Sequence, residues 1–348
     1  MAVTIPRPMT DPAEYDEFSC DPNSNVIETP DKLPPTVRIF RKVHGSFDVT
    51  MPDGRDIRFW GFVDPNTSGG DRTWPSPLIR VRQGQIVHAT LDAAKNTHTI
   101  HWHGIEPSTM NDGVGHTSFE VSNQYTYQWQ AKSPGTYFYH CHKNTVLHFE
   151  MGMYGPLIID PPSGPGLLYE RHPADEDQTT DLRYQAEAIW SFDDVDPRWH
   201  ELNHAAGLCG EDAGLNRFQP KYFLISGVPH PRTERDARVV VRAKKGQNIL
   251  LRAINATYSN LDISIGVNST IVEMDGRPLR TNPQLGTFSK PIPVAARAPT
   301  NLTPAQRTTF MIHNAQPGRY EVTATYRDWI TNRPHAAGGL ARTWIEVT

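Results

Sequence analysis

Two histidine-rich segments constrain the fold of this chain more than any other feature. The first is His-Thr-Ile-His-Trp-His-Gly at 98–104, and the second is the run 140–153, which begins His-Cys-His. Side chains alternate between the two faces of a strand. If the extended segments 98–103 and 137–142 pair side by side, His98 and Cys141 share one face. The opposite face then carries four histidines: His101, His103, His140 and His142.

The face with the cysteine has the ligands of a type 1, or blue, copper site. Such a site uses one thiolate, two imidazoles and a weak, distant thioether. Cys141, His148 and Met153 supply three of these ligands and His98 supplies the second imidazole, with Met151 as an alternative thioether. We therefore predict type 1 copper on this face. The four-histidine face predicts a second copper site, joined to the first through Cys141 and its histidine neighbours.

Short alternating strands separated by turns predict an all-β chain. Apolar and polar residues alternate at 37–40, 47–50, 57–60, 78–82 and 86–91, with turns such as Pro52-Asp-Gly54 between them. This spacing is typical of a β-sandwich, and 348 residues suffice for two domains. We expect an N-terminal arm at 1–35, a copper-binding sandwich at 36–162, and a linker with a second sandwich at 163–348.

The second half of the chain repeats the first. Residues 240–256 match 79–93, and residues 309–322 match 127–139. Aligning these repeats sets the histidines of the first half against residues that do not bind copper. The counterparts are Asn260, Ile263 and Ile265 in one segment, and Thr323, Ala324 and Thr325 in the other. The second domain is therefore predicted to be a scaffold.

These motifs resemble those of the multicopper oxidases and their relatives, the copper nitrite reductases. His-Trp-His-Gly at 101–104, Asp112-Gly113, the run 135–142 and Gly-Met-Tyr-Gly-Pro-Leu-Ile-Ile at 152–159 follow the family's order. The resemblance implies two tandem cupredoxin-like Greek-key domains and a laccase-like oxidase. A small-molecule or metal-ion donor would give electrons near His148, whose edge would approach the surface, and O2 would be reduced to water at a histidine-bound copper cluster. It also implies that Asp112 supplies protons.

Two features depart from the family pattern. His148 lies seven residues after Cys141, where multicopper oxidases usually have five. The family's trinuclear cluster is held by four His-x-His pairs, whereas this chain has two. Two chains facing each other through the first domain could pool their pairs, because an isologous interface presents each patch twice.

Two other arrangements remain open. In a nitrite-reductase-like trimer, the histidine face would hold one copper, completed by a histidine of a neighbouring chain. The candidates for that residue are His200, His204, His230, His313 and His335. In an electron-transfer protein, only the type 1 copper would be present. A homo-oligomer is expected in the first two cases, as a dimer, trimer or hexamer.

A competing motif is His-Glu-Leu-Asn-His at 200–204, the pattern of a zinc protease helix. Gly210 stands where one protease group has its third histidine, so we interpret the segment as a short surface or interface helix. The net charge of −4 and the absence of a dense basic block argue against nucleic-acid binding, and no apolar run is long enough to span a membrane. We expect a periplasmic or secreted protein, in which Cys20 and Cys209 could form a disulfide.

Overall fold

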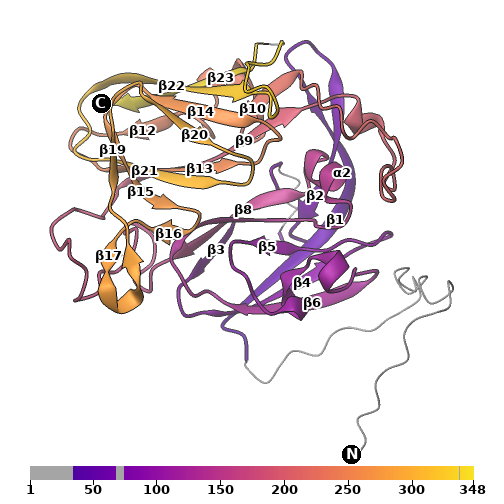
Figure 1. Cartoon of the computed structure of the whole chain (residues 1–348), viewed down its shortest axis with the longest axis horizontal. Coiled ribbons are helices and arrows are strands. Elements are labelled where there is room, and N and C mark those ends of the chain that lie inside the picture. The colour runs from indigo at the N-terminus through magenta and orange to yellow at the C-terminus, as the bar shows by residue number, and fades with distance from the viewer. Residues whose placement is uncertain (1–33, 68–73, 337) are drawn as a thin grey trace, which may run out of the picture.

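The computed structural model describes residues 34–67, 74–336 and 338–348, so Cys20 and nearly all of the predicted arm lie outside it. It is almost entirely β-structure, arranged as two stacked halves (Figure 1). The predicted all-β class is confirmed. Among the described residues, no helix is long and apolar enough to cross a membrane.

The first half contains two four-stranded sheets, in the orders β2-β1-β4-β6 and β3-β8-β7-β5. Their inward-facing side chains form one apolar core that includes Trp102, Tyr127 and Cys141. The strands are β1 (Val37–Thr50), β2 (Asp56–Val63), β3 (Ile79–Arg82), β4 (Ile86–Asp92), β5 (His101–His103), β6 (Gln124–Gln130), β7 (Gly135–His140) and β8 (Tyr154–Asp160).

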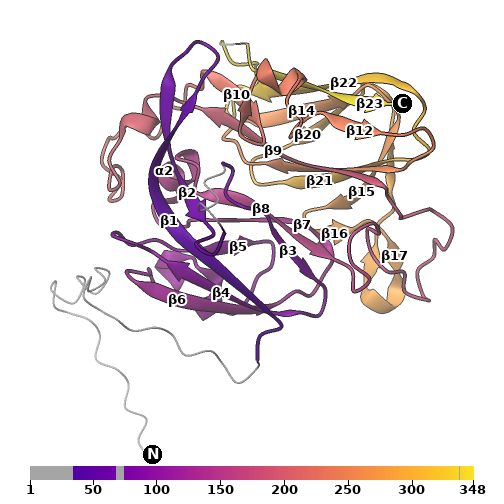
Figure 2. The same ribbon diagram turned by 180° about the vertical axis from the view of Figure 1, so that it is seen from behind.

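The second half has the same strand topology, which confirms the predicted repeat. Strands β10-β9-β13-β21 correspond to β2-β1-β4-β6, and β12-β23-β22-β14 correspond to β3-β8-β7-β5. The parallel pairs also correspond, since β1 with β4 and β3 with β8 are matched by β9 with β13 and β12 with β23. Figure 2 shows the two halves from behind.

The strands of the second half are β9 (Ala186–Val195), β10 (Tyr222–Ile225), β11 (Val228–Pro229), β12 (Val241–Ala243), β13 (Ile249–Asn255), β14 (Asn260–Ile265), β15 (Ser269–Met274), β16 (Arg277–Pro278), β17 (Thr281–Asn282), β18 (Thr287–Phe288), β19 (Ile292–Val294), β20 (Pro299–Leu302), β21 (Arg307–Ile312), β22 (Gly318–Arg327) and β23 (Leu340–Val347). The helices are α1 (Thr109–Asp112) and α2 (Thr145–Glu150), and the 3-10 turns are η2 (Gly115–Thr117), η3 (Trp199–Glu201), η4 (Arg232–Glu234) and η5 (Pro283–Leu285).

Strand β7, which leads to the predicted copper ligands, is buried at every position and packs against the second half. The backbone N–H of Thr136 donates to the buried Glu273 carboxylate at 2.8 Å, and Arg252 donates to Thr136 Oγ1 at 2.9 Å. Gly135 lies so close to Gly276 that an added Cβ would be 2.7 Å from its carbonyl oxygen. The second half therefore fixes the strand that ends at His140.

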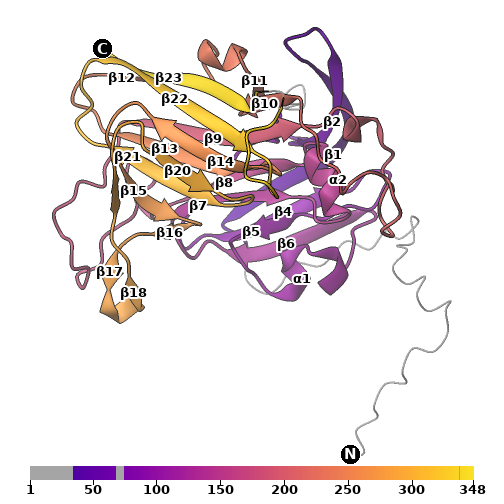
Figure 3. The same ribbon diagram turned by 45° about the horizontal axis from the view of Figure 1, so that its top comes forward.

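The β1–β2 hairpin and a long loop also join the halves. The hairpin packs its apolar side chains against Val195, Tyr222 and Leu224 of the second half. The loop between β9 and β10 crosses back to α2, where Trp199 packs with Leu147. Figure 3 shows α2 beside β1 and β2, with α1 near β6. These contacts bring residues far apart in sequence to the predicted copper site.

Candidate metal centre

Cys141 lies at the centre of a buried group of metal-ligating side chains. Its Sγ is 3.3 Å from Nδ1 of His148 and 3.7 Å from Nδ1 of His98. Met153 belongs to the same packed cluster as Cys141, and all four side chains are buried. The structure thus brings together the four residues predicted for the thiolate site.

The two methionines near this site have different surroundings. Met153 is tied into the site's backbone, because Cys141 N donates to Met153 O at 3.0 Å and Met153 N donates to His148 O at 3.1 Å. Met151 instead packs with Leu147 and Trp199 in a separate cluster. The packing therefore favours Met153 as the thioether.

The unusual spacing between Cys141 and His148 is accommodated by helix α2. Asn144 adopts the left-handed conformation (φ 42°) just before the helix, and His148 lies in its last turn. The side-chain amide of Asn144 donates to Ala206 O at 2.9 Å and to His204 O at 3.4 Å. The longer loop forms a helical turn that carries His148 back to the sulfur.

The protonation of this group suits a soft metal ion. Burial lowers the pKa of His148 to about 3 and holds the pKa of His98 well below its usual value, so both imidazoles are neutral. His148 Nε2 faces His204 O at 3.3 Å, which leaves Nδ1 as the lone-pair nitrogen beside Cys141. Burial raises the pKa of the Cys141 thiol to about 11, so a bound metal ion would have to displace its proton.

Four histidines gather on the other side of β5 and β7. The ring of His101 is 5.5, 5.2 and 5.2 Å from those of His103, His140 and His142, measured between centroids. Ligand atoms of His101, His103 and His140 lie within 4.8 Å of one another. The register explains this, since His101 pairs directly with His140 across the two strands.

Hydrogen bonds at one ring nitrogen leave the other available in three of these histidines. Nδ1 of His101 lies 2.8 Å from Asp112 O, Nδ1 of His140 lies 2.9 Å from Cys141 O, and Nδ1 of His142 lies 3.1 Å from Thr145 Oγ1. Each can therefore offer Nε2 to a metal. Nδ1 of His103 is buried without a hydrogen-bond partner among the described residues. An orphaned buried nitrogen of this kind fits a metal ligand.

Asp112 supports the histidine face from helix α1. Besides its carbonyl contact, its carboxylate Oδ1 is 3.3 Å from Nδ1 of His101. The next residue, Gly113, has φ +71°, and a Cβ there would lie 1.8 Å from Ile100 O. This close packing explains why glycine follows Asp112 and how the aspartate reaches the imidazole.

The structure corrects one expectation about the thiolate site and brings a further histidine to it. His148 was expected to approach the surface, but its side chain is fully buried because His204 and Trp60 cover it. His204, which was expected on a surface or interface helix, is partly buried and stands beside this site, since ligand atoms of His98, His148 and His204 lie within 4.8 Å of one another. In the sequence, His204 was noticed only as part of the pair His200 and His204, which matched a zinc-protease motif and gave no indication of a position beside Cys141.

The zinc-protease interpretation of residues 200–204 does not fit the structure. Only Trp199–Glu201 forms a 3-10 turn. Nδ1 of His200 lies 2.5 Å from Arg58 O, while His204 stands over His98. The two histidines thus belong to different environments. The other candidate histidines, at 230, 313 and 335, have side-chain or backbone partners within this chain.

The second half places an arginine rather than a histidine beside the four-histidine face. Arg307 of β21 stacks over Phe138 at 5.8 Å, and burial, with a smaller effect of the Arg307 charge, lowers the pKa of His103 to about 3. Both metal-competent groups found among the described residues draw on the first half, with His204 as the one contribution from beyond it. Cys209 is exposed and has no disulfide partner among the described residues, so the disulfide with Cys20 stays a prediction.

Comparison with known proteins agrees with this chemistry. The sequence model of the family described as multicopper oxidase matches residues 59–164. The multicopper oxidase MmcO of Mycobacterium tuberculosis is 29% identical over 230 residues, which cover 60% of this chain and 42% of that protein. The copper-containing nitrite reductase of Neisseria meningitidis is 27% identical over 47% of this chain and 43% of its own length. The chain therefore spans less than half of these relatives.

A solved structure matches over nearly the whole chain. The blue copper oxidase from Nitrosomonas europaea is 26% identical, with a TM-score of 0.66, and the match covers 89% of this chain and 85% of that one. Copper also suits the donor atoms present, since thiolate and imidazole are the ligands that copper favours. Residues 59–164 therefore form a multicopper oxidase domain, and the chain is related to the multicopper oxidases, with a copper nitrite reductase among its other relatives.

Proposed function

We propose that the protein is a copper-dependent oxidase that takes single electrons from a reducing substrate and reduces O2 to water. The observation that carries this proposal is the covalent connection between the two ligand sets. Cys141 contacts His98 and His148 on one side, and its sequence neighbours His140 and His142 belong to the four-histidine face. No other residue joins the two sets so directly within the described chain.

The protein's own residues have distinct roles in this proposal. His98, Cys141, His148 and Met153 would hold type 1 copper, and His101, His103, His140 and His142 would hold the second copper site. Copper bound there would supply one-electron redox chemistry and a place for O2 to be reduced. The low pKa of His103 and His140, caused mainly by burial, keeps both imidazoles neutral, so each ring has one unprotonated nitrogen that can bind a metal. Asp112 would pass protons to this face from its position beside the partly exposed ring of His101.

A full trinuclear cluster would need more histidines than one chain provides. His101 and His142 are only partly buried, so a second copy could approach this face. We propose a dimer through the first domain, in which four His-x-His pairs surround the two-fold axis. The alternative is a nitrite-reductase-like site with one copper on the three clustered histidines, which the relationship to a copper nitrite reductase favours. We further propose a periplasmic or secreted location.

Copper content per chain, measured on fully loaded protein of known oligomeric state, tests these proposals. About 2.5 coppers per chain in a species with an even number of chains would support a shared cluster. About two, with nitrite consumed in the absence of O2, would support the alternative. One copper per chain and no uptake of O2 with any donor would mean an electron carrier and would refute the oxidase. The matched variant Cys141→Ser should lose the intense thiolate-to-copper absorption and one copper per chain.

A further inference from the structure

The type 1 site is closed at the imidazole where electrons were expected to arrive. The His148 side chain is 0% exposed, with its Nδ1 toward Cys141 and its Nε2 against the carbonyl of His204. Trp60 packs edge-on against the same ring at 5.5 Å between centroids. A donor molecule outside the protein therefore cannot touch His148.

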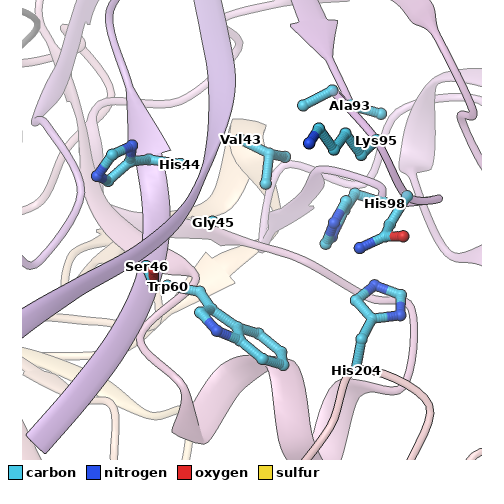
Figure 4. A pocket seen from close by; sticks show the side chains of 11 residues that line it. Val43, His44, Gly45, Ser46, Trp60, Ala93, Lys95, His98 and His204 are labelled. Carbon is cyan, nitrogen blue, oxygen red and sulfur yellow. The ribbon is translucent and has the colours of Figure 1, made fainter.

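A cavity opens on a different side of the same site. It has a volume of about 470 Å³, a size typical of small-molecule pockets. Four separate segments form its walls, as Figure 4 shows. They are the irregular part of β1, strand β2, the loop after β4 and the loop before β10, and they contribute Val43, Ser46, Trp60, Lys95, His98 and His204. Two of these residues, His98 and His204, also belong to the three-histidine group over the site.

His204 stands between this cavity and the buried ligands. Its ring centroid is 5.0 Å from that of His98 and 4.5 Å from that of His148, and 6.0 Å from that of Trp60. Its Nε2 is buried and has no hydrogen-bond partner among the described residues. The loop is held in place by Asn144, which donates to the carbonyls of His204 and Ala206. His204 is thus a fixed aromatic contact from the cavity to both imidazoles.

The cavity lining indicates the chemistry of its ligand. Trp60 offers an aromatic face, Val43 offers an apolar wall, and Lys95 brings a positive charge. No carboxylate is found among the described residues that line the cavity, so a metal cation would meet a lysine and no counter-charge. An aromatic molecule with an anionic substituent would stack on Trp60 and pair with Lys95.

We propose that an anionic aromatic reductant binds in this cavity and gives its electron through His98 and His204, without touching His148 itself. The proposal rests on the oxidase function proposed above. The donor loses one electron and, where its hydroxyl is neutral, one proton, which passes to solvent. Copper(II) held by His98, Cys141, His148 and Met153 would accept that electron and become copper(I). His204 is a positioning residue that closes the distance between donor and site.

Syringate and its methyl ester form a matched pair of probes, because they share the phenol ring and differ in the anionic carboxylate. Anaerobic stopped-flow measurement of the loss of the type 1 absorption band gives the reduction rate of the copper-loaded protein. Syringate should bind about threefold more tightly than the ester, since an exposed ion pair contributes modestly. Lys95→Gln should abolish that preference, and an unchanged preference would overturn the assignment of Lys95.

Two further variants test the route. Ser46→Trp would fill the cavity from an exposed position of β1 and should slow reduction by both probes, while Thr50→Trp, exposed on the same strand outside the cavity, should not. His204→Ala should slow reduction about tenfold, because a donor displaced by an ångström loses much of its rate, and should keep the absorption band. Unchanged or faster reduction in either Ser46→Trp or His204→Ala would place the electron path elsewhere.

Binding to the metal-free protein separates this proposal from the oxidase function. Calorimetry with 3,5-dimethoxybenzoate, which has no oxidisable hydroxyl, should detect binding to the wild type and to Thr50→Trp. It should detect weaker binding to Lys95→Gln and none to Ser46→Trp. Equal binding by all four proteins would refute the cavity site, whatever the copper content. Binding as expected in a protein without a type 1 band would refute the oxidase and leave the cavity site standing.

Discussion

Asp194 gives the most quantitative prediction, because its carboxyl group is buried where the two halves meet. It is 0% exposed, it accepts hydrogen bonds from Ser259 Oγ and from Tyr258 N, and Asp193 lies beside it. Burial is the largest influence on Asp194, and it raises the pKa from 3.8 to about 7. The folded protein therefore holds a proton that the unfolded chain releases above pH 3.8.

The sign of the effect follows from proton linkage. Between pH 3.8 and about 7 the folded state binds more protons at Asp194, so this group's contribution to stability is complete at low pH and is lost as pH rises. At about 1.4 kcal/mol per pH unit, the loss across that window is about 4 kcal/mol. Asp194→Asn keeps a carbonyl acceptor and cannot ionise. Relative to wild type, the variant should therefore gain about 4 kcal/mol of unfolding free energy between pH 4 and pH 7.5.

Urea unfolding of the metal-free proteins, followed by tryptophan fluorescence at several pH values, measures this difference. The buried histidines whose pKa is lowered act in the opposite direction, but they are present in both proteins and cancel. Asp177→Asn is a matched control, since hydrogen bonds from Thr180 and Thr179 lower the pKa of Asp177. Because a lowered pKa affects stability only below pH 3.8, the difference between Asp177→Asn and wild type should stay constant between pH 4 and pH 7.5. Parallel stability curves for wild type and Asp194→Asn would refute the reasoning.

Three other substitutions have defined outcomes. Met153→Leu should raise the reduction potential of the type 1 site in a redox titration, because a weak ligand to Cu(II) is lost, whereas Met151→Leu should leave it unchanged. Gly113→Ala should lower the unfolding free energy by about 3 kcal/mol or more, since its Cβ would meet Ile100 O at 1.8 Å. The control Gly54→Ala has a similar φ of +87° but open space around it, so it should lower the unfolding free energy by about 1 kcal/mol. Arg252→Met should cost about 3–5 kcal/mol by leaving the buried Glu273 without its cation, and calorimetric stability no lower than wild type would contradict this.

Local patterns were enough to predict most of the fold and which candidate ligands lie close together. Alternation placed β1 to β4. The period of two along β5 and β7, continued to the flanking residues His98 and Cys141, separated these two from the four-histidine face, as their contacts confirm. The repeat was visible because corresponding strands keep their turn glycines, Gly84 and Gly246. These features depend on neighbours in sequence or on direct strand pairing.

The covering of His148 by His204 and Trp60 could not be predicted from the sequence, because it depends on how distant segments pack. His204 lies 56 residues after His148, on a loop with no strand or helix of its own at that point. Its position follows from Asn144 and from the packing of Trp199 against α2. Similarly, nothing in the sequence around Thr136 indicates that its partners are Glu273 and Arg252.

The same loop limits how freely the copper-binding part of this protein can be exchanged during evolution. The segment that matches the multicopper oxidase family ends at residue 164, yet His204, whose carbonyl contacts His148, is encoded 40 positions later. A recombination event that transplanted only the first sandwich would deliver every ligand proposed for the type 1 site and leave His148 uncovered. A recombinant protein therefore needs both halves of the chain to obtain a site with His148 covered.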